Sequence, residues 1–176
     1  WEIWNRFCAD VRQHEFPPVV PADYDAVLEA LLREARPGCR FLEWGSATGV
    51  IAILAALLGF DACGLELDPA LVETSRALAA RFHSNARFVH GSFIPAGYAW
   101  RPASGDGRPG TIGDGDSGYL ALGRSLDEFE LVFAYPWGGE EPMLLDVMRC
   151  YGAADATLLL NTVDGEVRSY RGGQRA

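Results

Sequence analysis

The sequence predicts an α/β fold: a doubly wound, mostly parallel sheet with helices on both faces, shortened at the C-terminus. Short apolar runs alternate with segments of helical periodicity between residues 40 and 162. Hydrophobic residues make up 49% of the 176 residues, which is enough for one packed core. A turn and a second strand-like run follow the last apolar run, so we expect an antiparallel closing strand.

Two helical segments precede the alternating region. Residues 1–15 carry apolar side chains at helical spacing, and residues 22–35 form a second amphipathic stripe that ends at the Arg-Pro-Gly of 36–38. Residues 1–36 are therefore predicted to be the N-terminal helices of a single domain spanning residues 1–176.

The alternating region supplies the remaining strands and helices. Asp68 and Pro69 predict a helix start, because an aspartate side chain caps the first turn and proline is tolerated at its first position. Gly59 and Gly152 predict helix ends. Such an alternation favours right-handed crossovers and a parallel sheet. Strands are expected at 40–43, 62–66, 86–90, 130–134 and 157–162, and helices at 48–58, 69–82 and 140–151.

Two segments depart from this alternation. Residues 97–118 are rich in glycine and proline and lack periodicity, which predicts a flexible insertion, either a mobile lid or a disordered segment. Its Asp-Gly-Asp-Ser-Gly does not fit a calcium loop, because Tyr119 and Ser125 stand where glycine and glutamate are required. At the end of the chain, Asp164-Gly165 predicts a hairpin in which residues 166–171 pair antiparallel with 157–163 and close the sheet.

The net charge and the cysteine content limit the kinds of partner and the compartment that we expect for this protein. The net charge of −9 disfavours a nucleic-acid partner, and it fits small-molecule, protein or cationic partners as well as a role in solubility alone. The four cysteines form no C-x-x-C pair and have no histidine nearby in sequence, so we expect no metal site. Reduced, buried thiols predict a cytoplasmic protein. The longest apolar run is too short to span a bilayer, so no membrane partner is expected.

The candidate site begins at Glu-Trp-Gly-Ser-Ala-Thr-Gly, residues 43–49. In an open parallel sheet, ligands bind outside the carboxyl ends of the strands. Gly45 and Gly49 do not give the three-glycine spacing of a dinucleotide loop. The carboxylate of Glu43 would also repel a pyrophosphate by a few kcal/mol at ~6 Å and an effective dielectric constant of ~20. The pattern therefore favours a cationic ligand without phosphate, such as S-adenosylmethionine with its sulfonium and ammonium groups.

A second acid at the next strand end supports a nucleoside ligand. Glu66 comes 21 residues after Gly45, and a carboxylate at this position can accept hydrogen bonds from both ribose hydroxyls. Leu67 beside it is placed to cover one adenine face. Either acid alone is common at a solvated strand end, but their joint occurrence around a glycine turn favours ligand binding.

These residues resemble the first motif of the class I (Rossmann-like) S-adenosylmethionine-dependent methyltransferases, E/D-x-G-x-G-x-G, with Ala47 replacing the middle glycine. The resemblance covers residues 22 to about 162. It implies S-adenosyl-L-methionine as the cofactor and methyl transfer as the reaction. A third-strand position that is often an aspartate contacting the adenine amino group falls on Ser92. The implied cofactor-binding residues are Glu43, Trp44, Gly45, Ser46, Gly49, Glu66, Leu67, Ser92, Phe93 and Ala134.

The same resemblance places the acceptor near the loop after the fourth strand, Phe-Ala-Tyr-Pro-Trp. Family members that methylate exocyclic amines carry Asn/Asp-Pro-Pro-aromatic there, and Ala134 in place of the Asn or Asp disfavours base methylation. Tyr135 and Trp137 are the candidate catalytic residues. They either line a pocket for a cationic or flat acceptor or pack beneath the 97–118 insertion.

We therefore expect S-adenosylmethionine-dependent methyl transfer to an unidentified acceptor, a small molecule or a protein rather than a nucleic acid. The alternative is a non-catalytic S-adenosylmethionine- or nucleoside-binding module, or a subunit of a larger assembly. Glu43 and the missing glycine disfavour a third class, the dinucleotide-dependent oxidoreductases.

Overall fold

The computed structural model describes residues 22–99, 115–136, 139–162, 164–172 and 174–175. Seven strands form one sheet in the order β3-β2-β1-β4-β5-β6-β7. The strands are β1 (Arg40–Trp44), β2 (Asp61–Glu66), β3 (Arg87–His90), β4 (Leu131–Ala134), β5 (Thr157–Asn161), β6 (Val167–Arg171) and β7 (Gln174–Arg175). The helices are α2 (Tyr24–Glu34), α3 (Val50–Leu57), α4 (Pro69–Arg81), α5 (Tyr119–Leu122), the 3-10 turn η1 (Leu126–Glu128) and α6 (Glu141–Tyr151).

The sheet confirms the predicted fold class. Strands β1 to β5 pair in parallel, and β1 is central because it pairs with β2 on one side and β4 on the other. Strand order reverses between β1 and β4, which is where an open α/β sheet binds its ligands. The β6 strand pairs antiparallel with β5, as predicted from the Asp164-Gly165 turn.

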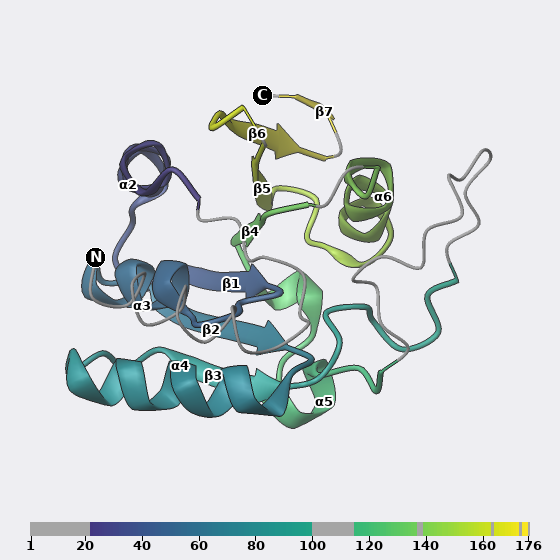
Figure 1. Ribbon diagram of the computed structural model, residues 1–176. Helices are drawn as coiled ribbons and strands as arrows, with labels where there is room; N and C mark the ends of the chain where they lie inside the picture. The colour runs from purple at the N-terminus through teal and green to yellow at the C-terminus, as the bar shows by residue number, and fades with distance from the viewer. Residues whose placement is uncertain (1–21, 100–114, 137–138, 163, 173, 176) are drawn as a thin grey trace.

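Helices cover both faces of the sheet (Figure 1). Helices α2, α3 and α4 pack on one face, and α5, η1 and α6 pack on the other. Side chains alternate along each strand, so Phe41 faces the α3 side while Leu42 and Trp44 face the α6 side. Each face has its own buried cluster, which is why the strands read as continuous apolar runs.

The predicted helix at residues 1–15 lies outside the described residues. The other expected helices and strands agree with the structure to within about two residues at each end. Asp68 caps α4 by accepting a hydrogen bond from the Ala70 N–H at 2.8 Å, and Pro69 is the first helical residue. The sequence did not predict α5, η1 or β7. The two-residue β7 pairs with β6 and extends the sheet by one more strand.

Residues 100–114 of the predicted insertion 97–118 lie outside the described residues, and the C-terminal end of the insertion is held against the residues that follow β3. Ser92 forms a parallel bridge with Ser117, and its N–H donates to the Asp116 carbonyl at 2.8 Å. Gly91 and Gly118 approach so closely that a Cβ on Gly91 would lie 2.6 Å from the Gly118 Cα. This contact leads the chain directly into α5.

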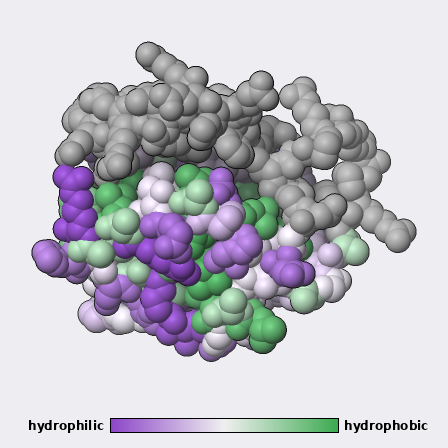
Figure 2. All heavy atoms as spheres, turned by 60° about the horizontal axis from the view of Figure 1, so that its bottom comes forward, coloured by the Kyte–Doolittle hydropathy of each residue, from purple (hydrophilic) through white to green (hydrophobic). Residues whose placement is uncertain are grey.

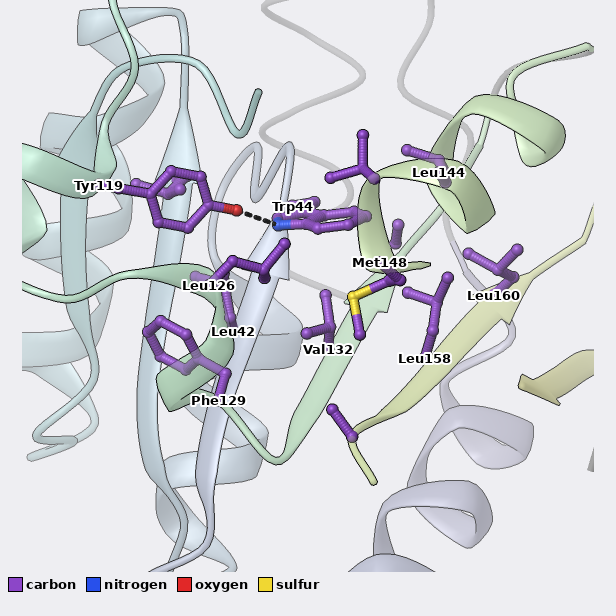
Figure 3. Close-up of a cluster of buried hydrophobic side chains, with 14 of the residues drawn as sticks. Leu42, Trp44, Tyr119, Leu126, Phe129, Val132, Leu144, Met148, Leu158 and Leu160 are labelled. Carbon is purple, nitrogen blue, oxygen red and sulfur yellow. Dashed lines mark hydrogen bonds between the residues drawn. The ribbon is translucent and has the colours of Figure 1, made fainter. Parts of the chain in front are cut away.

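The α6-side core contains one buried polar contact (Figure 3). The indole Nε1 of Trp44 donates to the Tyr119 hydroxyl at 2.9 Å, and both side chains are buried. Burial raises the pKa of the Tyr119 hydroxyl. Trp44 also stacks on Phe93, with ring centroids 5.2 Å apart. The end of β1 is therefore tied to α5 and to the loop after β3.

Replacing Tyr119 with phenylalanine is expected to destabilise the fold by about 1–3 kcal/mol, because the Trp44 N–H would remain buried without a partner. Denaturant unfolding measures this loss. The matched control is Tyr98→Phe, whose hydroxyl donates to Asp146 at 2.9 Å in a partly exposed pair. Equal losses for the two variants would contradict the importance of the buried indole.

Figure 2 shows the side of the molecule on which α4 lies, where hydrophilic and hydrophobic residues are interspersed. The Leu120 side chain of α5 is 93% exposed. Within the described ranges, every helix is too short or too polar to cross a bilayer.

Candidate functional site

The glycine loop between β1 and α3 is held in place by hydrogen bonds from both neighbouring elements. The Ala47 N–H donates to Glu66 Oε2 at 2.7 Å, and the Ala47 carbonyl accepts from the Ser75 hydroxyl of α4 at 2.9 Å. Ala47 has a φ of 45°, in the left-handed region that glycine adopts most easily. The alanine that replaces the middle glycine is thus held by hydrogen bonds to both its backbone N–H and its backbone carbonyl.

The two glycines of the loop have different physical requirements. Both have positive φ, +62° at Gly45 and +73° at Gly49. A Cβ on Gly49 would lie 2.4 Å from the Phe88 ring and 2.9 Å from the Ser75 Cβ, so packing requires glycine there. A Cβ on Gly45 would meet nothing within 4 Å. Among the described residues, the space over the Gly45 Cα is therefore open, whereas that over Gly49 is filled.

Glu43 lies beneath the loop and under the start of α3. Its side chain is 6% exposed, and its Oε2 accepts from the Ala52 N–H at 2.9 Å. Burial raises its pKa to about 8, and the nearby charge of Glu66 adds to the shift, while the Ala52 hydrogen bond opposes it. Without a nearby cation, Glu43 is therefore mostly protonated at neutral pH. Partial burial, and then the charge of Glu43, raise the pKa of the Tyr24 hydroxyl of α2.

Glu66 ends β2 and joins the glycine loop to the start of α4. Its Oε2 accepts from Ala47, and its Oε1 accepts from the Asp68 N–H at 3.0 Å. A carboxylate oxygen can accept two hydrogen bonds, so each oxygen keeps capacity for a ligand hydroxyl. The geometry is compatible with the predicted ribose contact. It also gives Glu66 a structural role that the sequence did not reveal.

The remaining predicted cofactor residues lie at the same edge of the sheet, but several point their side chains into the core. Trp44 and Ala134 are buried on the α6 side. The hydroxyl of Ser46 is buried without a partner among the described residues and lies over Gly64, where a Cβ would be 2.8 Å from it. Ser92 is also buried, and its hydroxyl accepts from the Ile94 N–H at 3.1 Å. Leu67 is half-buried and accepts through its carbonyl from His90.

The two candidate catalytic residues, Tyr135 and Trp137, follow the end of β4. Tyr135 is half-buried and directly follows Ala134, the last residue of β4. Trp137 lies outside the described residues. Of the two candidate catalytic residues, Tyr135 therefore stands beside the strand reversal, and the role of Trp137 stays a prediction.

Two residues at or near the carboxyl edge of the sheet were not singled out from the sequence. Ser75 is a serine in the middle of a helix, and nothing in its local sequence indicates that it bonds the glycine loop. Asn161 is different, because it is a polar residue that directly follows three leucines in the strand Thr-Leu-Leu-Leu-Asn. That interruption was a visible signal of a special position.

A pocket of about 270 Å³ lies elsewhere, between the end of α6 and the start of β5. It is lined by Met148, Ala156, Leu158 and Tyr170, among others, and by none of the predicted site residues. It opens at the amino end of β5, opposite the strand ends where ligands of such sheets bind. Within the described ranges, no three His, Cys, Asp or Glu side chains come together as a metal site. Cys39 and Cys63 are buried as expected, whereas Cys150 is exposed.

Comparison with known proteins shows sequence similarity to methyltransferases. No family model matches the chain. The ribosomal protein L11 methyltransferase of Thermus thermophilus is 42% identical over 69 residues, covering 39% of this chain and 27% of that protein. The enzyme of the same name from Ralstonia pickettii is 38% identical over 71 residues, covering 40% of this chain and 24% of that protein. The matched segment thus spans about a quarter of each relative.

Solved structures share the fold over most of the chain. An RNA methyltransferase from Salinibacter ruber, in complex with S-adenosyl-L-homocysteine, has a TM-score of 0.57 at 19% identity and covers 81% of this chain and 78% of that one. A precorrin-6y C5,15-methyltransferase from Geobacter metallireducens has a TM-score of 0.53 at 17% identity, covering 80% and 63%. The chain thus shares the Rossmann-like fold of these S-adenosylmethionine-dependent methyltransferase structures, and its matched segment is similar in sequence to methyltransferases.

Proposed function

We propose that this chain binds S-adenosylmethionine over Gly45, between Glu43 and Glu66, and transfers its methyl group to a protein acceptor. The observation that carries the proposal is the open space over Gly45 at the strand reversal, flanked by two acids. Residues 43–49 and 66–68 contain three acids and no lysine or arginine. Such a loop suits a cation better than a pyrophosphate.

Each acid has a distinct role in this proposal. Glu66 accepts hydrogen bonds from the ribose hydroxyls while it holds the Ala47 and Asp68 N–H groups. Glu43, once ionised, offers a negative charge to the cationic end of the ligand. The bound cofactor supplies an electrophilic methyl group on a sulfonium. Tyr135 borders the acceptor side, and alignment of the nucleophile with the methyl group supplies much of the rate.

A protein acceptor is supported by the names of the sequence relatives and by the net charge of −9, which disfavours nucleic acid. The second candidate, a non-catalytic S-adenosylmethionine-binding module, is motivated by Ala134, which offers no polar side chain at the end of β4. A cytoplasmic location and a single domain over residues 1–176 belong to the same proposal.

Calorimetric titration with S-adenosylhomocysteine and with NAD tests the cofactor. We expect micromolar binding of the former and none of the latter. Transfer of radiolabelled methyl groups to purified ribosomal protein L11, with duplex RNA as the comparison, then tests the acceptor. Preferential binding of NAD would overturn the proposal, whereas cofactor binding without transfer to any acceptor in a wider screen would favour the non-catalytic module.

Replacing Glu66 with alanine is expected to weaken S-adenosylhomocysteine binding by about 2–4 kcal/mol, because two charge-assisted hydrogen bonds are lost. That corresponds to roughly 30-fold to 900-fold in the dissociation constant. Ser75→Ala is the control, because it removes a different hydrogen bond to the same residue, Ala47. Similar losses of affinity in both variants would mean that Glu66 acts only by holding the loop.

A further inference from the structure

Asn161, the last residue of β5, is a buried amide without hydrogen-bond partners in the part of the chain that the structure describes. It is 1% exposed, and neither its Oδ1 nor its Nδ2 has a partner among the described residues. The other buried polar side chains of this region are paired, since Thr157 accepts from Arg171 and Thr162 contacts the Glu166 carbonyl. An unsatisfied buried donor or acceptor costs about 1–3 kcal/mol, so such a group calls for an explanation.

The register places Asn161 beside the proposed chemistry. Trp44 pairs with Ala134, and Ala134 pairs with Leu160. The next position along each strand is Gly45, Tyr135 and Asn161, so these three residues form one row at the carboxyl edge of the sheet. Two interstrand spacings separate Gly45 from Asn161, roughly 10 Å. A cofactor over Gly45 and an acceptor group beside Tyr135 fit within that span.

Asn161 and Glu43 also lie on the same face of the sheet. Alternation along β5 puts Asn161 on the same side as Leu159, which packs with α2 and α3, and opposite Leu160. Glu43 of β1 lies on that side too, since its carboxylate bonds the first turn of α3. The unpartnered amide and the buried acid therefore face one end of the same layer. Ala134, in contrast, is buried in the opposite layer.

A carboxamide offers one acceptor oxygen and two N–H donors and carries no charge. It can orient an amine by accepting its N–H, but it cannot act as a base. The acidic balance of the chain, with a net charge of −9, favours an acceptor that arrives as a cation. We propose that Asn161 binds the acceptor of the proposed methyltransferase, and that this acceptor is a primary amine; the inference rests on that proposed function.

In this arrangement the incoming ammonium first loses a proton to water, which frees the nitrogen lone pair. Asn161 Oδ1 accepts one remaining N–H and so directs the lone pair toward the methyl carbon. The new N–C bond forms as the C–S bond breaks, and the electron pair of the C–S bond returns to sulfur. The methylated ammonium then releases one proton to water.

Binding measurements test the role of Asn161 without an identified substrate. The probes are S-adenosylhomocysteine and its analogue in which nitrogen replaces sulfur and carries a 2-aminoethyl arm, which places a primary amine on the acceptor side. Calorimetry compares the wild-type chain with Asn161→Leu and Asn161→Ala. We expect S-adenosylhomocysteine affinity to change by less than about twofold, and affinity for the amine analogue to fall about tenfold or more.

The control variant is Thr157→Val, which removes a buried, paired hydroxyl at the other end of β5. It should lower the melting temperature and leave the preference between the two probes unchanged. Asn161→Leu should melt at or above the wild-type temperature, because an apolar side chain of similar size removes unpaired polar groups. A melting temperature well below wild type in both Asn161 variants, with the probe preference kept, would assign Asn161 a structural role and overturn the inference.

The same titrations separate this inference from the proposed function. If the wild-type chain binds neither probe, the proposed cofactor site is wrong and the inference falls with it. If the wild-type chain binds both probes and the Asn161 variants weaken them equally or not at all, the cofactor site stands and only the role of Asn161 is overturned.

Discussion

Replacing Gly49 with alanine is expected to destabilise the protein by about 2–5 kcal/mol. The left-handed backbone costs a residue with a Cβ about 1–2 kcal/mol, and overpacking of a close-packed core adds about 1–3 kcal/mol. The Cβ would meet the Phe88 ring at 2.4 Å and the Ser75 Cβ at 2.9 Å. Thermal unfolding should show a melting temperature lower by roughly 10 °C.

Gly45→Ala is the matched control, because it has a similar φ and nothing within 4 Å of the added Cβ. This substitution should destabilise the protein only by the cost of a left-handed backbone conformation, about 1–2 kcal/mol. Its larger effect should be on S-adenosylhomocysteine affinity, because the Cβ projects into the proposed ligand space. Equal stability losses for the two glycines, or unchanged affinity in Gly45→Ala, would contradict this division of roles.

Raising the pH is expected to destabilise the ligand-free protein through Glu43. Its pKa rises from 4.5 in the unfolded chain to about 8 in the fold, so the folded state binds the extra proton. The associated stability is fully present below about pH 4.5 and is lost as the pH rises through 8. Between about pH 5 and pH 8 the loss is about 3 kcal/mol.

Glu43→Gln should abolish this dependence of stability on pH, because glutamine keeps an oxygen for the Ala52 N–H but does not ionise. Denaturant unfolding of both proteins across this pH range measures the difference, which cancels the titration of other groups. A cationic ligand favours ionised Glu43, so wild-type affinity for S-adenosylmethionine should also rise with pH up to about 8 relative to Glu43→Gln. Parallel stability curves for the two proteins would show that Glu43 does not titrate in this range.

The sequence predicted the parallel sheet well because its strands are buried on both faces and its helices carry clear start and stop signals. The Asp164-Gly165 turn likewise predicted β6 pairing against β5. The short elements α5, η1 and β7 were not predicted. They have four, three and two residues, too few to show a periodicity, and contacts made after folding stabilise them.

The sequence predicted where the candidate-site residues lie in the fold, but not which contacts they make. The sequence placed Glu43, Gly45 and Glu66 at strand ends beside the strand reversal, and the structure brings them together. Local sequence cannot show that close packing against Phe88, a residue 39 positions away, requires glycine at position 49. It also cannot show that Glu43 is buried or that Ser75 bonds Ala47, because these facts depend on how α3 and α4 pack over the loop.

The pairing of β1 with two strands has a consequence for the order of folding. Strands β1, β2 and β3 with α3 and α4 lie within residues 40–90, so the glycine loop and both of its acids come from one continuous stretch. Phe41 pairs with Leu131, 90 positions further along the chain, and this ladder joins that stretch to β4 and β5. Bringing together two strands so far apart in the sequence is slow compared with forming local crossovers. During synthesis from the ribosome, residues 40–90 are therefore expected to reach their native arrangement first, and β4 and β5 to dock onto them later.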